Sequence, residues 1–183
     1  MPVSRSTATG VRPTRATTTD MRVLTLSDSD SYLKWVVALT AGAPEDWAVR
    51  HLVLDNVIAP STAQIGAVLR DHPGRPIRRV SGLGLAREVR RLDPDVLFLA
   101  TTGPALAAVR DLLTWGGVLD RRRPVLASGL PGISFPANDL AIHHRRDIDV
   151  MVLHSHREVR AYAEVTASLG FGPRLALATL PFL

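Results

Sequence analysis

The feature that most constrains this chain is a repeated pairing of a short apolar segment with a helix start. About every twenty-five residues a β-rich run is followed by Ser, Thr or Asp and then by a helical pattern. No Asn-Gly hairpin turn joins these runs. Strands and helices that alternate in this way predict a parallel sheet with right-handed crossovers and helices on both faces. We therefore expect an α/β fold, a Rossmann-like, doubly wound, mainly parallel sheet of about six or seven strands.

The expected strands and helices occupy residues 21–183 as one lobe. Residues 1–20 lack an apolar period and are predicted to form a disordered tail. The predicted strands are 22–26, 47–54, 76–80, 95–100, 124–128, 149–153 and 174–178. The predicted helices are 31–41, one from Ser61 or Thr62 to Pro73, 81–92, 103–115, a short one from Ala137 or Asn138, and 155–169 with a capping box at Ser155 and Glu158.

Composition excludes several classes of protein. The chain has 183 residues, no apolar run long enough to span a membrane and no secretory signal, and it lacks cysteine. These features are consistent with a cytoplasmic protein without disulfides. The formal charge is +5, but the basic residues are dispersed and aromatic residues are few, which makes nucleic acid an improbable partner. Attraction to phosphate-bearing substrates, or peripheral contact with an anionic membrane, accounts for the charge equally well.

The first expected strand ends at a dense polar turn, residues 27–31, Ser-Asp-Ser-Asp-Ser. In doubly wound sheets ligands collect beyond the carboxyl ends of the strands, so Ser27, Ser29 and Ser31 are candidate substrate contacts. Asp28 and Asp30 are candidate catalytic bases, since a carboxylate there could take a proton from an acceptor hydroxyl. The alternative is that these residues only cap the helix and complement its dipole. Two carboxylates favour a hydroxyl-bearing ligand over a nucleotide at this corner.

Three further strand ends carry polar or glycine-rich turns that would lie along the same rim. His154 could act as a base or bind phosphate because its charge changes near neutral pH, and packing or capping is its alternative role. The His154 and His156 pair lacks a third ligand, so no metal site is expected. The remaining candidate substrate contacts at these turns are Thr101, Thr102 and Gly103, then Ser128, Gly129, Gly132 and Ser134, then His154, Ser155 and His156.

Other motifs carry less information. His143, His144, Arg145 and Arg146 are interpreted as a solvated basic face, with an Arg–acceptor contact as the alternative. Gly82 and Gly84 follow a strand, but Arg87 occupies the place of the third glycine, so the dinucleotide fingerprint is absent. Neither a Walker loop nor a Gly-x-Ser-x-Gly elbow occurs.

Three segments resemble one protein family. They are Met-Arg-Val-Leu-Thr-Leu-Ser-Asp-Ser-Asp-Ser-Tyr-Leu-Lys-Trp at 21–35, Leu-Pro-Gly-Ile-Ser-Phe-Pro at 130–136 and Val-Leu-His-Ser-His-Arg-Glu-Val-Arg at 152–160. In these segments the chain resembles a family of candidate glycosyltransferases, known as a domain of unknown function in actinobacterial genomes. The resemblance runs from residue 21 to the last residue, and it assigns no role to any single residue.

The resemblance implies a GT-B-type enzyme with two Rossmann-like lobes. The present chain would be the N-terminal lobe, which binds a small-molecule or glycan acceptor. A second lobe would hold most of the nucleotide-sugar donor, a co-substrate rather than a cofactor, so the chain alone is expected to be inactive. The apolar stretch from Thr179 to Leu183 is the expected docking point for that lobe or a partner. The alternatives are a non-catalytic binding lobe, a nucleotide-sugar epimerase and a glycerophosphate-transferase-like enzyme.

Overall fold

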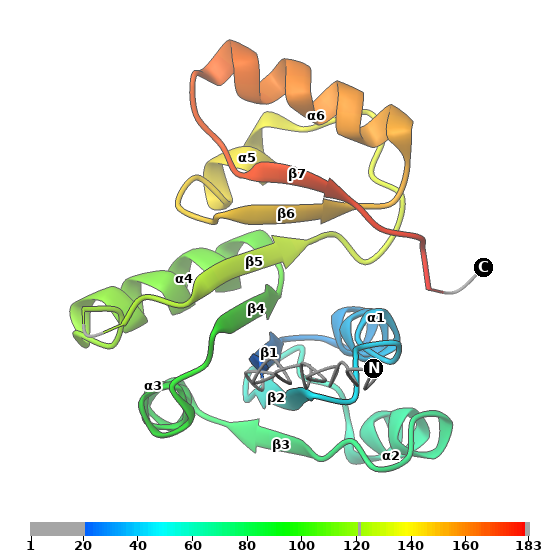
Figure 1. Ribbon diagram of the computed structural model, residues 1–183, viewed down its shortest axis with the longest axis vertical. Coiled ribbons are helices and arrows are strands. Elements are labelled where there is room, and N and C mark those ends of the chain that lie inside the picture. Colours follow the sequence, from blue (N-terminus) through cyan, green and yellow to red (C-terminus); the bar gives the residue numbers. More distant parts are fainter. Residues whose placement is uncertain (1–20, 121, 182–183) are drawn as a thin grey trace, which may run out of the picture.

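A seven-stranded sheet forms the centre of the computed structural model, which describes residues 21–120 and 122–181 (Figure 1). The predicted tail 1–20 lies outside the described residues. The strands are β1 (Met21–Ser27), β2 (Trp47–Leu54), β3 (Ile77–Val80), β4 (Val96–Ala100), β5 (Val125–Gly129), β6 (Val150–Leu153) and β7 (Arg174–Leu177). The helices are α1 (Asp30–Leu39), α2 (Thr62–Asp71), α3 (Gly82–Leu92), α4 (Gly103–Trp115), α5 (Asp139–His144) and α6 (His156–Leu169).

The strand order is β3-β2-β1-β4-β5-β6-β7, and every neighbouring pair is parallel. The chain first winds outward from β1 to β3, then returns to β4 beside β1 and winds the other way. The predicted Rossmann-like α/β fold is confirmed, with a sheet that is parallel throughout. The reversal of winding direction places the topological switch point between β1 and β4.

Alternating side chains of the central strands build two separate cores. Leu24, Leu26, Leu97 and Leu99 pack beneath α3 and α4 on one face of the sheet. On the opposite face, Phe98 packs with Tyr32, Trp35 and Val36 of α1. Each fully buried side chain of this size contributes about 1.5–3 kcal/mol to folding. Strands buried on both faces have near-continuous apolar sequences, as the run 96–100 does.

Helix caps set most of the element boundaries where the sequence predicts them. Ser61 begins α2 with a complete capping box to Gln64, and Ser81 caps α3 by accepting from the Gly84 N–H. Asn138 likewise caps α5. Gly103 followed by Pro104 predicts an N-cap at Gly103, but the N-cap of α4 is Thr102. This one-residue shift matters because Thr102 takes part in the contacts described below.

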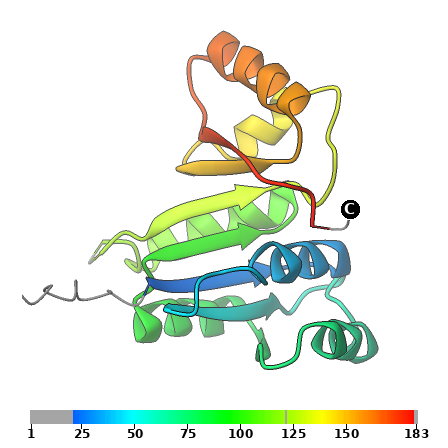
Figure 2. The ribbon, with the colours of Figure 1, turned by 45° about the vertical axis from the view of Figure 1, so that its right-hand side comes forward.

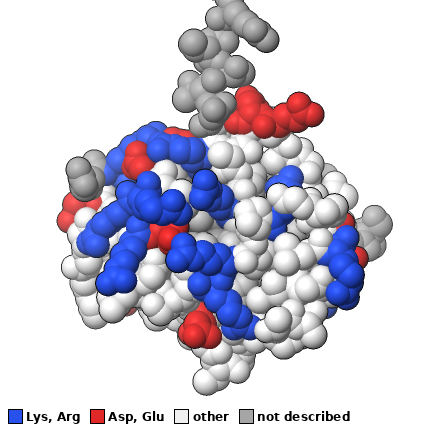
Figure 3. All heavy atoms as spheres, turned by 90° about the horizontal axis from the view of Figure 1, so that it is seen from below, with Lys and Arg blue, Asp and Glu red and all other residues white. Residues whose placement is uncertain are grey.

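Two global properties complete the description of the fold. Among the described residues, no helix is both long and apolar enough to cross a bilayer. Basic side chains gather on one face, over the β3 edge of the sheet (Figure 3).

Candidate functional site

The carboxyl ends of the strands meet along one edge of the sheet, where β4, β5 and their neighbours point in Figure 2. The predicted corners after β1, β4, β5 and β6 therefore lie along a single rim, in the order in which those strands adjoin one another. Ser27 pairs with Ala100 in the register of β1 and β4. The polar residues that follow these two strands therefore flank the switch point directly.

Asp28 connects the ends of β1 and β4. Its side chain is fully buried, and its Oδ2 accepts hydrogen bonds from the Thr102 backbone N–H at 2.9 Å and from the Thr102 hydroxyl at 2.6 Å. Thr102 is the N-cap of α4, so Asp28 also places a negative charge at the positive end of that helix. The two bonds fix the orientation of the carboxylate. The other oxygen, Oδ1, is buried and has no hydrogen-bond partner among the described residues.

Two hydroxyl groups beside Asp28 also lack partners. Ser27 Oγ and Thr101 Oγ1 are buried without a hydrogen bond within the described part of the chain. Leaving a buried polar group unpaired costs about 1–3 kcal/mol. With Asp28 Oδ1 and the buried Oδ1 of Asp30, four oxygens unpaired in the described chain lie at or just after the ends of β1 and β4, and a ligand can bond to them only where the surrounding turns move apart.

The rest of the β1–α1 turn lies nearer the surface. Asp30 forms an ion pair with Lys34 at 2.6 Å, one helical turn along α1. Ser29 is the N-cap of α1 but makes no side-chain capping bond, and its Oγ lies 3.4 Å from that of Ser31. Capping alone therefore does not account for the serines of this turn.

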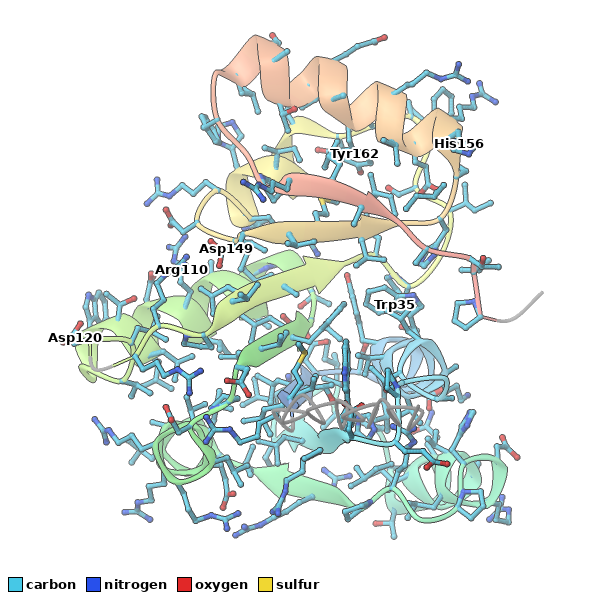
Figure 4. The ribbon with its side chains drawn as sticks, viewed as in Figure 1. Trp35, Arg110, Asp120, Asp149, His156 and Tyr162 are labelled. Carbon is cyan, nitrogen blue, oxygen red and sulfur yellow. The ribbon has the colours of Figure 1, made fainter. Side chains whose placement is uncertain are left out.

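The rim at β5 and β6 is built differently, because Trp35 of α1 fills it (Figure 4). Trp35 Nε1 donates to His154 Nε2 at 2.8 Å, so the proton of the neutral imidazole sits on Nδ1, which donates to the Ala178 carbonyl at 3.0 Å. The Leu130 carbonyl lies 3.1 Å from the same Nε2. Both ring nitrogens of His154 are thus occupied by protein groups.

Gly129 makes room for that tryptophan. A Cβ atom at this position would lie 2.5 Å from Trp35 Cη2 and 2.7 Å from the Val152 carbonyl oxygen. The close approach of ring and backbone explains the glycine without any ligand. Gly103 has a similar role, since a side chain there would meet the His144 ring. Gly132 lies in open space, with nothing near its missing Cβ.

Polar groups at the β5 and β6 ends bind to one another. Ser128 Oγ donates to the Leu99 carbonyl at 2.8 Å, and Ser134 pairs with the Tyr162 hydroxyl at 3.0 Å. Buried Glu158 accepts from the Ser134 backbone N–H at 2.6 Å and from the Ser155 hydroxyl at 2.8 Å. Ser155 caps α6 by accepting from the Glu158 N–H, as expected, but the second half of the predicted capping box is replaced: the Glu158 carboxylate accepts from the Ser155 hydroxyl and the His154 backbone N–H. His156 is exposed at the start of α6.

Arg145 contradicts its interpretation as part of a solvated basic face. The Arg145 side chain is only 2% exposed. It lies about one helical turn after buried Ile142, and that spacing is the sequence signal that could have predicted its burial. Its Nε donates to Ser128 Oγ and its Nη2 to the Gly129 carbonyl. Burial lowers the pKa of Arg145. Burial also raises the pKa of nearby Tyr32, and the positive charge of Arg145 partly opposes that rise. His143 and Arg146 are exposed, as expected.

The described residues hold no group of three or more His, Asp or Glu side chains placed to bind a metal ion. The hollows with measured volumes lie elsewhere: a cavity of about 320 Å³ near Arg90 and Arg122 sits at the amino-terminal edge of the sheet. Its arginines are committed to neighbouring protein oxygens. The orphaned oxygens at the β1–β4 switch point are therefore the stronger candidate site.

A parallel sheet wound in two directions, with an oriented carboxylate at its switch point, defines a Rossmann-like α/β protein with a candidate site for a hydroxyl-bearing ligand. Comparison with protein families identifies the family to which the chain belongs. The profile of the family described as "Putative glycosyltransferase (DUF6716)" matches residues 23–183, and the chain belongs to that family. A comparison with curated proteins found no match.

Proposed function

We propose that this chain is the N-terminal, acceptor-side lobe of a GT-B-type glycosyltransferase. In this proposal the switch point binds the acceptor, and a nucleotide-sugar donor is held mainly by a second lobe. Family membership supports the reaction class, and the fold is compatible with it. The observation that carries the site is Asp28, with one oxygen fixed by Thr102 and the other buried and without a partner in the described chain.

Asp28 is suited to act as a general base in an inverting transfer. The acceptor oxygen forms a bond to the anomeric carbon of the donor sugar while the bond from that carbon to the nucleoside diphosphate breaks. The leaving diphosphate takes the electron pair, and Oδ1 of Asp28 takes the proton of the acceptor hydroxyl. Thr102 holds the carboxylate in place, and the buried Thr101 hydroxyl, next to Thr102 in the chain, is proposed to contact the acceptor.

The other two candidate bases are less well placed. One oxygen of Asp30 is engaged by Lys34 in a partly exposed ion pair, and its Oδ1 is buried and, like that of Asp28, unpaired within the described residues. Asp28 differs in being held by the backbone and hydroxyl of Thr102 rather than by a flexible lysine. His154 uses Nε2 to accept from Trp35 and Nδ1 to donate to Ala178, so it would have to break a protein contact before it accepted a proton. We therefore assign the base to Asp28.

The β1–α1 corner is a poor site for the donor phosphates. Only Asp28 and Ser29 separate β1 from α1, and neither is the glycine that lets a backbone approach a pyrophosphate closely. Carboxylates at the helix start would also repel the phosphates. The same features count against an epimerase that binds a dinucleotide at this turn. We therefore propose that a second lobe binds most of the donor, and residues 21–183 alone are expected to catalyse no transfer.

Substitution of Asp28 tests the proposal in a protein that contains this chain together with its donor lobe. Asp28→Asn keeps the shape of the side chain but removes the base, so we expect the rate of sugar transfer to fall by about 10²–10⁴-fold. The melting temperature should fall by only a few degrees, because the charge at the start of α4 is lost, and the thermal shift caused by a panel of nucleotide sugars should stay the same. Asp30→Asn is the matched control and should retain activity within a few-fold.

Two results would overturn the proposal at different levels. An Asp28→Asn variant that transfers sugar at the wild-type rate would remove the assigned base while leaving the reaction class intact. Failure of the complete protein to transfer or hydrolyse any nucleotide sugar in the panel would count against the glycosyltransferase itself.

A further inference from the structure

Arginines at the amino-terminal edge of the sheet are neutralised by carboxylates. Arg22 and Arg122 share Asp93 and Asp95, and the pKa of Asp95 is lowered, chiefly by the hydrogen bond from the Arg22 backbone N–H. The other ion pairs of this edge are Arg110 with Asp111 and Asp147, Arg123 with Asp149, and Arg146 with Asp147. This part of the surface therefore carries little net charge.

The surface of α3 and the adjoining strands is not balanced in this way. We call it the β3–α3 face, and it carries the exposed residues Arg50, Arg78, Arg79, Arg87 and Arg91, of which Arg79 pairs with Asp55. Glu88 is also paired with this group: it binds Arg78 at 2.6 Å and Arg91 at 2.5 Å. The hydrogen bond from Arg91 lowers the pKa of Glu88, so one ionised carboxylate serves two arginines. Figure 3 shows basic side chains gathered on this side of the molecule.

Apolar side chains project beside the β3–α3 face at the carboxyl ends of β2 and β3. Val57 is fully exposed, at 103%, and Ile58 is 50% exposed. Leu83, at 68% exposed, lies one turn before Arg87 on the outer side of α3. The Asp55 N–H donates to the Val80 carbonyl and ties the Val57 loop to the end of β3. Aliphatic tips therefore adjoin a positively charged face.

We propose that the β3–α3 face docks this protein on a membrane containing anionic phospholipids. The arginines would bind lipid phosphates while Val57, Ile58 and Leu83 enter the headgroup region. Two weak signals of this kind, a basic patch and a small apolar insertion, together give stable but reversible attachment. This inference does not depend on the proposed glycosyl transfer.

Charge and side-chain chemistry favour a lipid surface over nucleic acid. Binding to single strands uses aromatic side chains on which bases stack. The exposed large aromatic residues in the described part of the chain are Trp47, Trp115, Phe135 and Phe171, none of which belongs to α3, β3 or the Val57 loop. Fully exposed aliphatic residues gain nothing from a phosphate backbone in water, but they gain burial in a bilayer.

Co-sedimentation of the full-length protein with vesicles tests the proposal. We expect binding to vesicles that contain phosphatidylglycerol, weak binding to pure phosphatidylcholine, and loss of binding as salt is raised, because the screening length falls from about 10 Å at 0.1 M to about 3 Å at 1 M. The double variant Arg78→Gln, Arg87→Gln should bind about tenfold to thirtyfold more weakly. Leu83→Ser should also weaken binding while leaving the salt dependence intact.

Matched controls come from the opposite edge. Arg146→Gln and Leu140→Ser change an exposed arginine and a 58% exposed apolar side chain at and just after α5, away from the β3–α3 face, and both should bind vesicles like the wild type. All five positions are on the surface, so thermal unfolding should be unchanged. Equal binding to neutral vesicles, or an equal loss in the controls, would overturn the proposal. The proposal would also be overturned if the protein bound nucleic acid but not vesicles, and the double variant lost that binding to nucleic acid.

Discussion

The two halves of the carboxyl rim carry similar types of polar residue but differ in how completely those residues are hydrogen-bonded. Both carry serines and a residue able to accept a proton, Asp28 at the β1 end and His154 at the β6 end. At the β1–β4 corner, four buried oxygens, those of Ser27, Asp28, Asp30 and Thr101, have no partner in the described chain. At the β5–β6 corner, His154, Ser128 and Ser134 each bind protein groups. The first corner has unused bonding capacity, whereas the second serves to hold the structure together.

Trp35 is the physical reason for this difference. It projects from α1 over β4 and β5, packs edge-on against Phe98 with ring centroids 5.5 Å apart, and reaches His154 with its N–H. A large ring at this place leaves the β5–β6 corner no room for a ligand. The lesson is that position at the end of a strand makes a residue a candidate, and the bonds it already makes decide between function and structure.

The largest expected effect comes from removing that ring. Trp35→Ala should lower the free energy of unfolding by about 3–5 kcal/mol, because it opens a cavity in the core and leaves His154 Nε2 without its donor. Urea denaturation measures the change. Trp115→Ala, at an 86% exposed tryptophan, is the control and should stay within about 0.5 kcal/mol of the wild type. A loss below about 1 kcal/mol for Trp35→Ala would show that the ring does not close the β5–β6 corner.

A smaller loss is expected from adding one methyl group beside the tryptophan. In Gly129→Ala the new Cβ would meet both the Trp35 ring and a backbone carbonyl, so we expect about 2–3 kcal/mol of destabilisation by urea denaturation. Gly132→Ala is the matched control in the same loop region. Nothing lies within 4 Å of its Cβ position, so stability should be unchanged or slightly higher. Equal effects at the two glycines would contradict the tight packing inferred at the β5–β6 corner.

The free energy of unfolding should depend on pH because of a buried histidine in β2, in the half of the sheet that carries the β1–β4 corner. His51 of β2 is fully buried, its Nδ1 lies 2.8 Å from Thr25 Oγ1, and its Nε2 is unpaired. Burial, aided by the charges of Arg75 and His72, lowers the pKa of His51 from an ordinary 6.5 to about 4. Below pH 6.5 His51 therefore binds a proton in the unfolded chain, whereas in the folded chain it stays neutral down to about pH 4.

Acidification across this window should favour the unfolded state. Between pH 7.5 and pH 5 the His51 contribution amounts to about 2 kcal/mol of lost stability. Urea unfolding at the two pH values should show this loss in the wild type, and His51→Gln, which does not titrate there, should lose correspondingly less. Parallel pH profiles for the two proteins would mean that His51 is not held neutral by burial.

The local part of this architecture could be predicted from the sequence, and the long-range part could not. Apolar periodicity and serine caps are local signals, and they locate β2, α2 and α3 almost to the residue. Asp28 and Thr102 are each foreseen as candidates, but their hydrogen bond joins residues 74 positions apart. The Trp35–His154 bond spans 119 positions. No local pattern encodes such pairs. The burial of Arg145 does have a local signal, its spacing from Ile142, but its partners Ser128 and Gly129 are 17 and 16 positions away.

The smallest expected effects compare one hydroxyl from each corner. Ser128→Ala removes a partner of the Leu99 carbonyl and of Arg145 Nε, so it should destabilise the fold by about 1–2 kcal/mol. Thr101→Val removes a buried hydroxyl that has no partner, and a methyl group of similar size takes its place. Its stability should therefore be unchanged or rise by up to about 1 kcal/mol, as measured by urea denaturation. Because the Thr101 hydroxyl is free to bind a ligand, a loss of acceptor affinity without a loss of stability would place that hydroxyl in the binding site. Destabilisation of both variants by the same amount would instead show that the β1–β4 corner is as fully committed to the fold as its neighbour.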